Sequence, residues 1–411
     1  MKPTVIVALA CVLFATPAAL AQQAGENINV LPVVLPQDSP DDWFVVGDGF
    51  LQRQVEPTIA ASTRNPDHLV AFFNDYRAVD IPDDAGLGEA ETMIAVLSIV
   101  RTFMFAGLWL FTVRADGRVT FETFWGSSLA APTAHLDILQ KGLVDVILGC
   151  RIYTPGKTPL GPYHYVLPFG PTDMNIVNKA TRQMYEEIPA FREELAKQNA
   201  VLIANFVTMP YDMISKTPVS SLADMKGRKI GLIGQYFGRW VKPAGLVPVV
   251  APMSERYNLL QSGITEMDFH PITHMNAFKV QELARNYIKL EAMVGAPWDL
   301  MINLEKFNSL PADVQKIMLD AGKEAEVVMA NELAAKWRDR ILGAWKTQGV
   351  SFSTFPVEER AKWAALVDDI PSEWATEMEK KGLPGWLIMN RYQEITTQLG
   401  YKWPRKWAVR N

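Results

Sequence analysis

The sequence is poor in cysteine. Its 411 residues include 2 cysteines, Cys11 and Cys150. Cys11 lies inside an N-terminal apolar run that we expect to be removed, so the mature chain keeps Cys150 alone and can form no intramolecular disulfide. A hydrophobic core must stabilise the fold instead, and a chain of this length with 49% hydrophobic residues is able to build one.

The chain also has no excess of positive charge. Its net charge is −5, and no run of Lys and Arg is dense enough to follow a phosphate backbone. Nucleic acid is therefore not an expected partner. A small anionic ligand remains compatible with this composition, because one or two local cations are enough to hold it.

Motifs for two kinds of chemistry are missing. The sequence contains no nucleophile-elbow pattern G-x-S-x-G, although Ser127, His135 and Asp145 supply the residue types of a hydrolase triad. His270 and His274 have the i, i+4 spacing of a zinc-binding pair, but a proline lies between them and no third ligand is near. We therefore expect no enzyme, no cofactor and no metal site, with a secreted hydrolase as the alternative.

Residues 1–21 have the composition of a secretory signal peptide. Lys2 precedes an apolar run over residues 5–14, and the small residues Ala19 and Ala21 precede a cleavage site before Gln22. This pattern predicts export, and we expect the mature protein in the periplasm.

Residues 22–114 form an atypical N-terminal segment that is rich in Pro, Asp and Gly. Residues 55–77 indicate two short strands around a turn, and this stretch weakly resembles the opening blade of a sialidase-like β-propeller. No second copy follows, and one blade cannot close a propeller. Residues 91–113 are an apolar run, interrupted by Arg101, that is long enough to cross a bilayer. We expect a buried helix or helix–strand pair here, with a membrane span as the alternative.

From residue 115 onward, strands alternate with amphipathic helices, as in α/β domains with mainly parallel sheets. Residues 118–125, 132–143 and 144–148 predict one strand–helix–strand unit. A long helix begins at Pro311 and meets no breaker before Gly349, so at 1.5 Å per residue it extends about 55 Å, enough to underlie two lobes. Further expected elements are strands at 201–206, 229–233 and 246–250 and helices at 190–198 and 255–262.

Five stretches of this region resemble, in the same order, the DctP-type solute-binding proteins of TRAP (tripartite ATP-independent periplasmic) transporters. They are DGRVTFETFWGSSL (116–129), LQKGLVDVILG (139–149), SKTPVSSLADMKGRKIGLIG (215–234), SERYNLLQSGITEMDFHP (254–271) and FNSLPADVQKIMLDAGKEA (307–325). The resemblance implies a two-lobed periplasmic-binding-protein fold over residues 115–411, with discontinuous lobes joined by hinge strands and spanned by the long helix. It also implies a ligand that is enclosed between the lobes and delivered to membrane permease subunits.

The sequence departs from the family where the ligand is usually held. The clamping arginine of a K-G-L-K-I-R-V-P segment is replaced by Gly231, and a second arginine before the N-K-P-V-type segment is replaced by Tyr211. Without these arginines, the protein lacks the bidentate guanidinium contacts that usually bind the carboxylate of a small dicarboxylate. We therefore expect a small organic acid, aromatic or larger and weakly charged, with a small-dicarboxylate binder that has substituted clamp residues as the alternative. The family's first strand and helix also have no match before residue 116.

The candidate ligand-binding residues follow predicted strands or stand at family contact positions. Open α/β sheets bind ligands outside the carboxyl ends of their strands, and we expect Tyr211, Gln235, His270 and Arg151 to converge on one cleft. Arg151 is the preferred replacement cation, with a surface or hinge salt bridge as its alternative. Trp298 has a core position as its alternative. The full set is Trp125, Arg151, Tyr153, Tyr211, Gln235, Tyr236, Phe269, His270, Trp298 and Asp299.

Mass spectrometry of a periplasmic fraction should find a mature chain that begins at Gln22, since the small residues Ala19 and Ala21 predict cleavage there. Recovery of the chain only from detergent-extracted membranes would contradict this expectation and favour a membrane span over residues 91–113.

Overall fold

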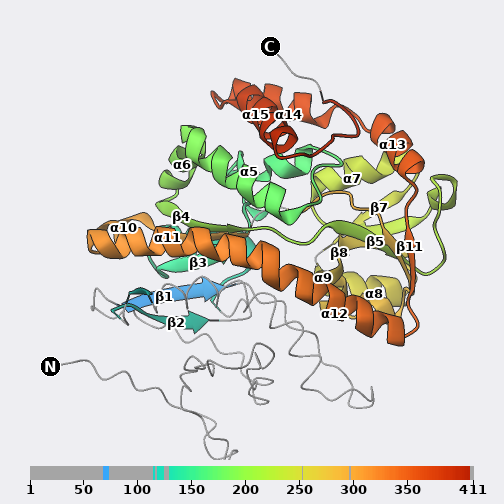
Figure 1. Cartoon of the computed structure of the whole chain (residues 1–411), viewed down its shortest axis with the longest axis horizontal. Coiled ribbons are helices and arrows are strands. Elements are labelled where there is room, and N and C mark those ends of the chain that lie inside the picture. The colour runs from blue at the N-terminus through green and yellow to red at the C-terminus, as the bar shows by residue number, and fades with distance from the viewer. Residues whose placement is uncertain are drawn as a thin grey trace, which may run out of the picture.

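The structure is a computed structural model that describes residues 68–73, 114–115, 118–124, 129–251, 253–295 and 298–407. The expected signal peptide and the apolar run over residues 91–113 lie outside these residues. Within the described part, no helix is long and apolar enough to cross a membrane. The described strands form a five-stranded and a six-stranded sheet, and helices pack around both (Figure 1). These two sheets confirm the expected two-lobed α/β architecture.

The five-stranded sheet is mixed. Its strands, in spatial order, are β2 (Thr120–Phe124), β1 (His68–Phe73), β3 (Val146–Gly149), β10 (Trp298–Asn303) and β4 (Ala200–Phe206). β1 is parallel to β2 and β3, whereas β10 is antiparallel to β3 and β4. The expected strand–helix–strand unit consists of β2, α4 (His135–Gln140) and β3, with β1 inserted between its two strands.

The inserted strand β1 lies in the stretch that resembles a propeller blade. Propeller blades belong to the antiparallel all-β architectures, but β1 pairs in parallel, with His68 opposite Thr120 and Ala71 opposite Val146. The second of the two strands expected over residues 55–77 is therefore present, as an inner strand of the first sheet whose pairing differs from that of a propeller blade. Its distant pairing partners leave no local signal in the sequence.

The six-stranded sheet is also mixed. Its strands, in spatial order, are β11 (Ser351–Thr354), β9 (Asn286–Lys289), β5 (Tyr211–Ser215), β8 (Met267–Pro271), β6 (Lys229–Leu232) and β7 (Val247–Val250). β6 is parallel to β7 and β8, and β5 is antiparallel to β8. The carboxyl ends of β6, β7 and β8 therefore lie at the same edge as the start of β5.

The expected elements between residues 190 and 262 are confirmed. β4, β6 and β7 are the predicted strands, and the predicted helices are α6 (Pro189–Ala196) and α8 (Arg256–Gln261). The observed helices are slightly shorter than the apolar pattern indicates.

Besides residues 304–350, which lead from β10 to β11, two chain segments connect the sheets, one between β4 and β5 and one between β9 and β10. They are hydrogen-bonded to each other, because Tyr211 N donates to Met293 O at 2.7 Å and Ala292 N donates to Tyr211 O at 3.0 Å. Gly295 N also donates to Thr208 Oγ1 at 3.1 Å. Each sheet therefore draws on separate stretches of the chain.

One long helix runs alongside both sheets (Figure 1). It consists of α11 (Ala312–Val328), a π-helical turn η10 (Met329–Leu333) and α12 (Ala334–Thr347), which follow one another without a break. Pro311 precedes its first residue, and Gly349, with a φ of 80°, follows its end. The expected long helix is confirmed, but it contains a π turn where a regular α-helix was expected.

α11 approaches β4 closely at Gly322. A Cβ atom at this position would lie 2.3 Å from the carbonyl oxygen of Ile203. Ile203 stands where the pairing of β4 with β10 shifts register. About one turn further along the helix, Glu326 accepts a hydrogen bond from Asn205 N at 2.6 Å. A glycine and a carboxylate thus dock the long helix onto an irregular part of the strand.

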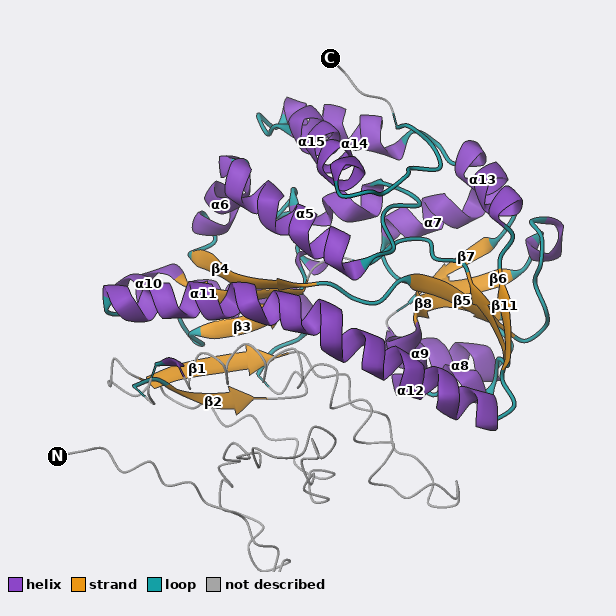
Figure 2. Ribbon diagram, in the orientation of Figure 1, coloured by secondary structure: helices purple, strands orange, loops and turns teal. Residues whose placement is uncertain are grey.

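Three C-terminal helices form a layer at the top of Figure 2. They are α13 (Val357–Leu366), α14 (Ile370–Lys380) and α15 (Gly385–Gln398). α15 packs on α5 (Met174–Glu187). Trp363 Nε1 in α13 donates to Trp240 O at 2.7 Å, and Tyr401 OH donates to Phe169 O at 2.7 Å. This layer therefore contacts elements that follow the strands of both sheets.

Gly322→Ala should destabilise the fold by about 1–3 kcal/mol, because the added methyl group must displace a backbone carbonyl of β4. Gly343→Ala is a matched control in the same long helix, since Gly343 is exposed and nothing lies within 4 Å of a Cβ atom added there. The control should stabilise the protein by about 0.5–1 kcal/mol through helix propensity. Urea unfolding measures both effects, and equal stability of the two variants would contradict the close approach.

Candidate ligand site between the lobes

Strand ends from both sheets meet at one junction. β6 ends at Leu232, and Gly234 follows with a φ of 66°. A Cβ atom at Gly234 would lie 3.4 Å from Cδ1 of Ile152, which belongs to the short helix η4 (Arg151–Tyr153) after β3. The ends of β6 and β3, one from each sheet, are therefore in contact. Open α/β folds bind ligands at such strand ends.

Buried aromatic side chains lie at this junction. The ring of Tyr211 is 5.3 Å from the ring of Phe269 and 5.3 Å from that of His270, measured between centroids. The ring of Phe237, in α7 (Gln235–Val241), is 4.7 Å from that of Tyr211. Burial raises the pKa of Tyr211, and a hydrogen bond with Tyr165 opposes this rise. The structure thus brings three of the expected residues into one cluster.

Arg151 is held in a buried ion pair. Its Nε donates to Asp299 Oδ2 at 2.5 Å, and its Nη1 lies 3.6 Å from Glu194 Oε2. The side chains of Arg151 and Asp299 are 4% and 0% exposed. The structure shows a salt bridge, but it is buried inside the first lobe, whereas the alternative expected for Arg151 was a salt bridge at the surface or the hinge. Two carboxylates neutralise the cation that an acidic ligand would need, so the charge of Arg151 is already used within the first lobe.

The other expected site residues lie around the junction. Tyr153 and Tyr236 are partly buried and pack against the main hydrophobic core. Trp298 is 8% exposed at the start of β10, so it takes the core position that is its alternative. Trp125 lies outside the described residues, as does the side chain of Gln235, whose backbone opens α7.

A buried guanidinium that the sequence did not predict, that of Arg256, lies at this edge. Its side chain is 1% exposed, and its Nη1 donates to Asp268 Oδ2 at 3.0 Å. Its Nε and Nη2 donate to Ala251 O at 3.2 and 3.0 Å. A Cβ atom at Gly231 would lie 2.4 Å from Arg256 Nη1, so Arg256 occupies the space that a side chain there would need. The available signal is an arginine four residues before Leu260 on the buried face of α8.

Two buried histidines lie beside the aromatic cluster. The rings of His270 and His274 are 4.7 Å apart between centroids. Burial lowers the pKa of His274 to about 4 and that of His270 well below its ordinary value, so both rings are neutral at pH 7. Among the described residues, no group of three or more side chains is placed to hold a metal ion.

His135 and Asp145, two of the residues that could belong to a hydrolase triad, interact with other groups in the structure. Burial lowers the pKa of His135 to about 4, although hydrogen bonds with the backbone of Ala130 and Leu148 oppose this. The carboxylate of Asp145 lies 3.9 Å from the Lys306 ammonium. Ser127 lies outside the described residues.

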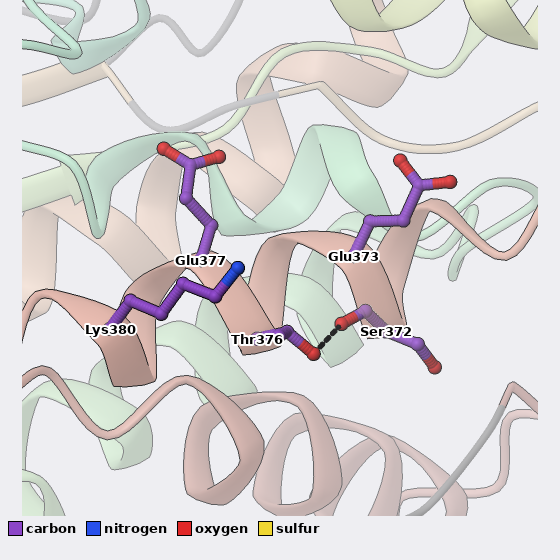
Figure 3. Close-up of a pocket in the computed structure, with 5 residues that line it drawn as sticks. All are labelled: Ser372, Glu373, Thr376, Glu377 and Lys380. Carbon is purple, nitrogen blue, oxygen red and sulfur yellow. Dashed lines mark hydrogen bonds between the residues drawn. The ribbon is translucent and has the colours of Figure 1, made fainter.

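A shallow depression of about 420 Å³ lies away from the junction, on α14. Its lining side chains come from this single helix, as Figure 3 shows, so it lacks the convergent polar groups of a ligand site. Glu373 is moreover paired with Arg239, whose Nη1 donates to Oε2 at 2.7 Å. The lining residues are Ser372, Glu373, Thr376, Glu377 and Lys380.

Two solute-binding proteins are similar to this chain in sequence. The C4-dicarboxylate-binding periplasmic protein DctP of Rhodobacter capsulatus is 24% identical over 269 residues, which cover 63% of this chain and 78% of that protein. A solute-binding protein of Albidiferax ferrireducens is 24% identical over 220 residues, which cover 52% of this chain. This second match spans 63% of the relative's length, less than two thirds.

Solved structures share the fold. An extracytoplasmic solute receptor of Bordetella pertussis that binds pyroglutamic acid superposes with a TM-score of 0.64 at 18% identity, over 79% of this chain and 99% of that chain. A marine-metagenome TRAP solute-binding protein specific for aromatic acid ligands superposes with a TM-score of 0.66 at 19% identity, over 81% and 100% of the two chains. At these identities the likeness shows the fold.

The family profile described as bacterial extracellular solute-binding protein, family 7, matches residues 108–377. This range includes β2 to β11 and the long helix, so it spans both sheets. The resemblance to DctP-type proteins is thereby confirmed, and the chain belongs to the bacterial extracellular solute-binding proteins of family 7.

Proposed function

We propose that this chain is the periplasmic receptor of a TRAP transporter, which captures a small organic acid between its lobes and delivers it to membrane permease subunits. The observation that carries the proposal is the junction of strand ends, where the cluster of Tyr211, Phe269 and His270 adjoins the segment after β3. A cleft between two lobes buries most of a small ligand, and a ligand that contacts both lobes favours closure.

An acid that carries a ring is the ligand class that suits this site best. Tyr211, Phe237 and Phe269 supply aromatic surface, which favours ring contacts beyond simple burial. The similar structures bind pyroglutamic acid and aromatic acids, which supports the same class here. A small dicarboxylate, as in the name of the Rhodobacter capsulatus relative, is the second candidate. Gly231 replaces a clamping arginine, which disfavours it.

The proposed ligand-binding set retains the residues around the junction, with Arg151 and Asp299 in a positioning role. Asp299 lies opposite Gly149 in the pairing of β10 with β3. The ion pair therefore holds η4 against the sheet edge from the inside of the first lobe. The proposed contact residues are Trp125, Tyr153, Tyr211, Gln235, Tyr236, Phe269, His270 and Trp298. We propose no catalytic role for any of them, since the family is one of solute-binding proteins.

Differential scanning fluorimetry of the mature protein with pyroglutamate, orotate, 3-hydroxybenzoate and succinate tests the receptor function. A ligand at 100 times its Kd adds about 2.7 kcal/mol to the stability of the folded state. At least one acid should therefore raise the melting temperature, with a ring acid giving the largest rise. If none of these acids raises it, the proposed function is contradicted.

Tyr211→Leu should weaken the binding of such an acid by about 10-fold, because the ring at the centre of the cluster is lost. Tyr257→Leu is the matched control, since the Tyr257 hydroxyl bonds to Glu282 at 3.3 Å on the exposed side of the lobe. Isothermal titration calorimetry compares the two variants with the unmodified protein. Equal affinities in all three would place the ligand away from Tyr211.

A further inference from the structure

One buried ion pair at the junction, that of Arg256 and Asp268, lies outside the set of proposed contact residues. Arg256 donates to Ala251 O directly after β7, Asp268 belongs to β8, and Gly231 of β6 lies against the guanidinium. The pair therefore lies at the carboxyl ends of β6 and β7 and beside the second residue of β8, whose own end is at Pro271. Open α/β sheets bind their ligands outside such carboxyl ends.

The charge of Arg256 reaches the aromatic cluster. Burial is the main cause of the shifts there, raising the pKa of Tyr211 and lowering that of His270, and the charge of Arg256 lowers both. The guanidinium is thus within electrostatic range of two residues proposed to hold the ligand. His270 and His274 are neutral, so they do not compete with Arg256 for an anion.

Arg256 retains donors for a ligand. A guanidinium has five N–H groups, and among the described residues its bonds to Asp268 and Ala251 use three of them. The remaining N–H groups suit a carboxylate oxygen, because charge-assisted hydrogen bonds from guanidinium to carboxylate are among the strongest in proteins.

Asp268 retains an acceptor. Its Oδ2 accepts from Arg256, but no described residue donates to its Oδ1, although the side chain is 1% exposed. A buried carboxylate oxygen without a donor is unfavourable. An N–H or O–H group of a bound molecule would satisfy it.

We infer that Arg256 and Asp268 recognise the ligand as a pair: Arg256 binds its carboxylate, and Asp268 Oδ1 accepts a hydrogen bond from an N–H or O–H group of the same molecule. This inference rests on the proposed function and names its substrate class, a monocarboxylic acid that carries a hydrogen-bond donor, such as a hydroxy acid or a lactam acid. The second carboxylate of a dicarboxylate would meet Asp268, and two buried like charges repel each other.

Gly231 makes this arrangement possible. A Cβ atom at Gly231 would lie 2.4 Å from Arg256 Nη1 and 2.9 Å from Asp268 Oδ2, so any side chain there would displace both partners. The absence of a side chain at Gly231 therefore leaves room for the guanidinium from α8 and for the carboxylate beside it.

Isothermal titration of the mature protein with matched acids tests the inference without any variant. Pyroglutamate is compared with cyclopentanecarboxylate, and 3-hydroxybenzoate with benzoate, because the first acid of each pair carries a donor, a lactam N–H or a phenol O–H, that its partner lacks. The donor-bearing acid of at least one pair should bind about 10-fold or more tightly than its partner, and succinate should bind more weakly than that acid. Equal affinity within both pairs would overturn the inference and leave the receptor function standing. Absence of binding by all five acids would overturn both.

Asp268→Asn keeps the shape of the side chain but removes the charge that repels a second carboxylate. The affinity of succinate relative to the best donor-bearing acid should rise about 10-fold in this variant. Glu266→Gln is the matched control, because Glu266 is a 48% exposed carboxylate two residues away that pairs with Arg228. The control should leave the ratio unchanged. An unchanged ratio in a folded Asp268→Asn protein would overturn the inference, and if that variant does not fold, the matched-acid comparison decides.

Discussion

The backbone pairing between the two connecting segments fixes the geometry of the junction. Tyr211 is hydrogen-bonded through both its N–H and its C=O to residues 292–293, so the first residue of β5 is tied to the second connection. The Asp212 carboxylate strengthens this tie by accepting hydrogen bonds from Leu290 N at 2.9 Å and Glu291 N at 2.8 Å. Gly295 completes it, because a Cβ atom there would lie 2.6 Å from the Tyr211 ring. The position of the aromatic cluster therefore follows from the chain crossings themselves.

The buried charges of the two lobes are paired differently. In the first lobe Arg151 lies between Asp299 and Glu194, and Arg182 pairs with Glu326 on the long helix. In the second lobe, Asp268 is the one carboxylate among the described residues that pairs with Arg256. Removing one partner of a buried pair is strongly destabilising, because the other charge is left uncompensated. The first-lobe network joins the sheet, the long helix and η4, whereas the second-lobe pair joins α8 to β8 beside the junction.

The sequence predicted the order of strands and helices well, because apolar periodicity is a local property. It also predicted that Tyr211 and His270 meet, because both stand at contact positions of the family that the chain resembles. It did not predict that Arg151 is neutralised, because its partner Asp299 is 148 residues away. Arg256 was missed although Asp268 is 12 residues away, since the substitution at Gly231 gave no hint of which side chain fills the space. A strand was expected near β1, but its parallel pairing with distant strands was not, because such pairing leaves no local pattern.

The π turn Met329–Leu333 sets the rotational phase of the long helix. Ala325 in α11 and Ile341 in α12 are both buried, yet on a regular α-helix residues with their spacing would point about 160° apart around the axis. A π turn accommodates about one additional residue and so turns the following segment back by roughly 100°. The two buried faces thereby come closer to the same side of the rod, each toward its own lobe. Between these two contacts the helix contains one residue more than a regular α-helix would need. The π turn accommodates this residue, so each lobe packs against a buried face of the helix that points toward it.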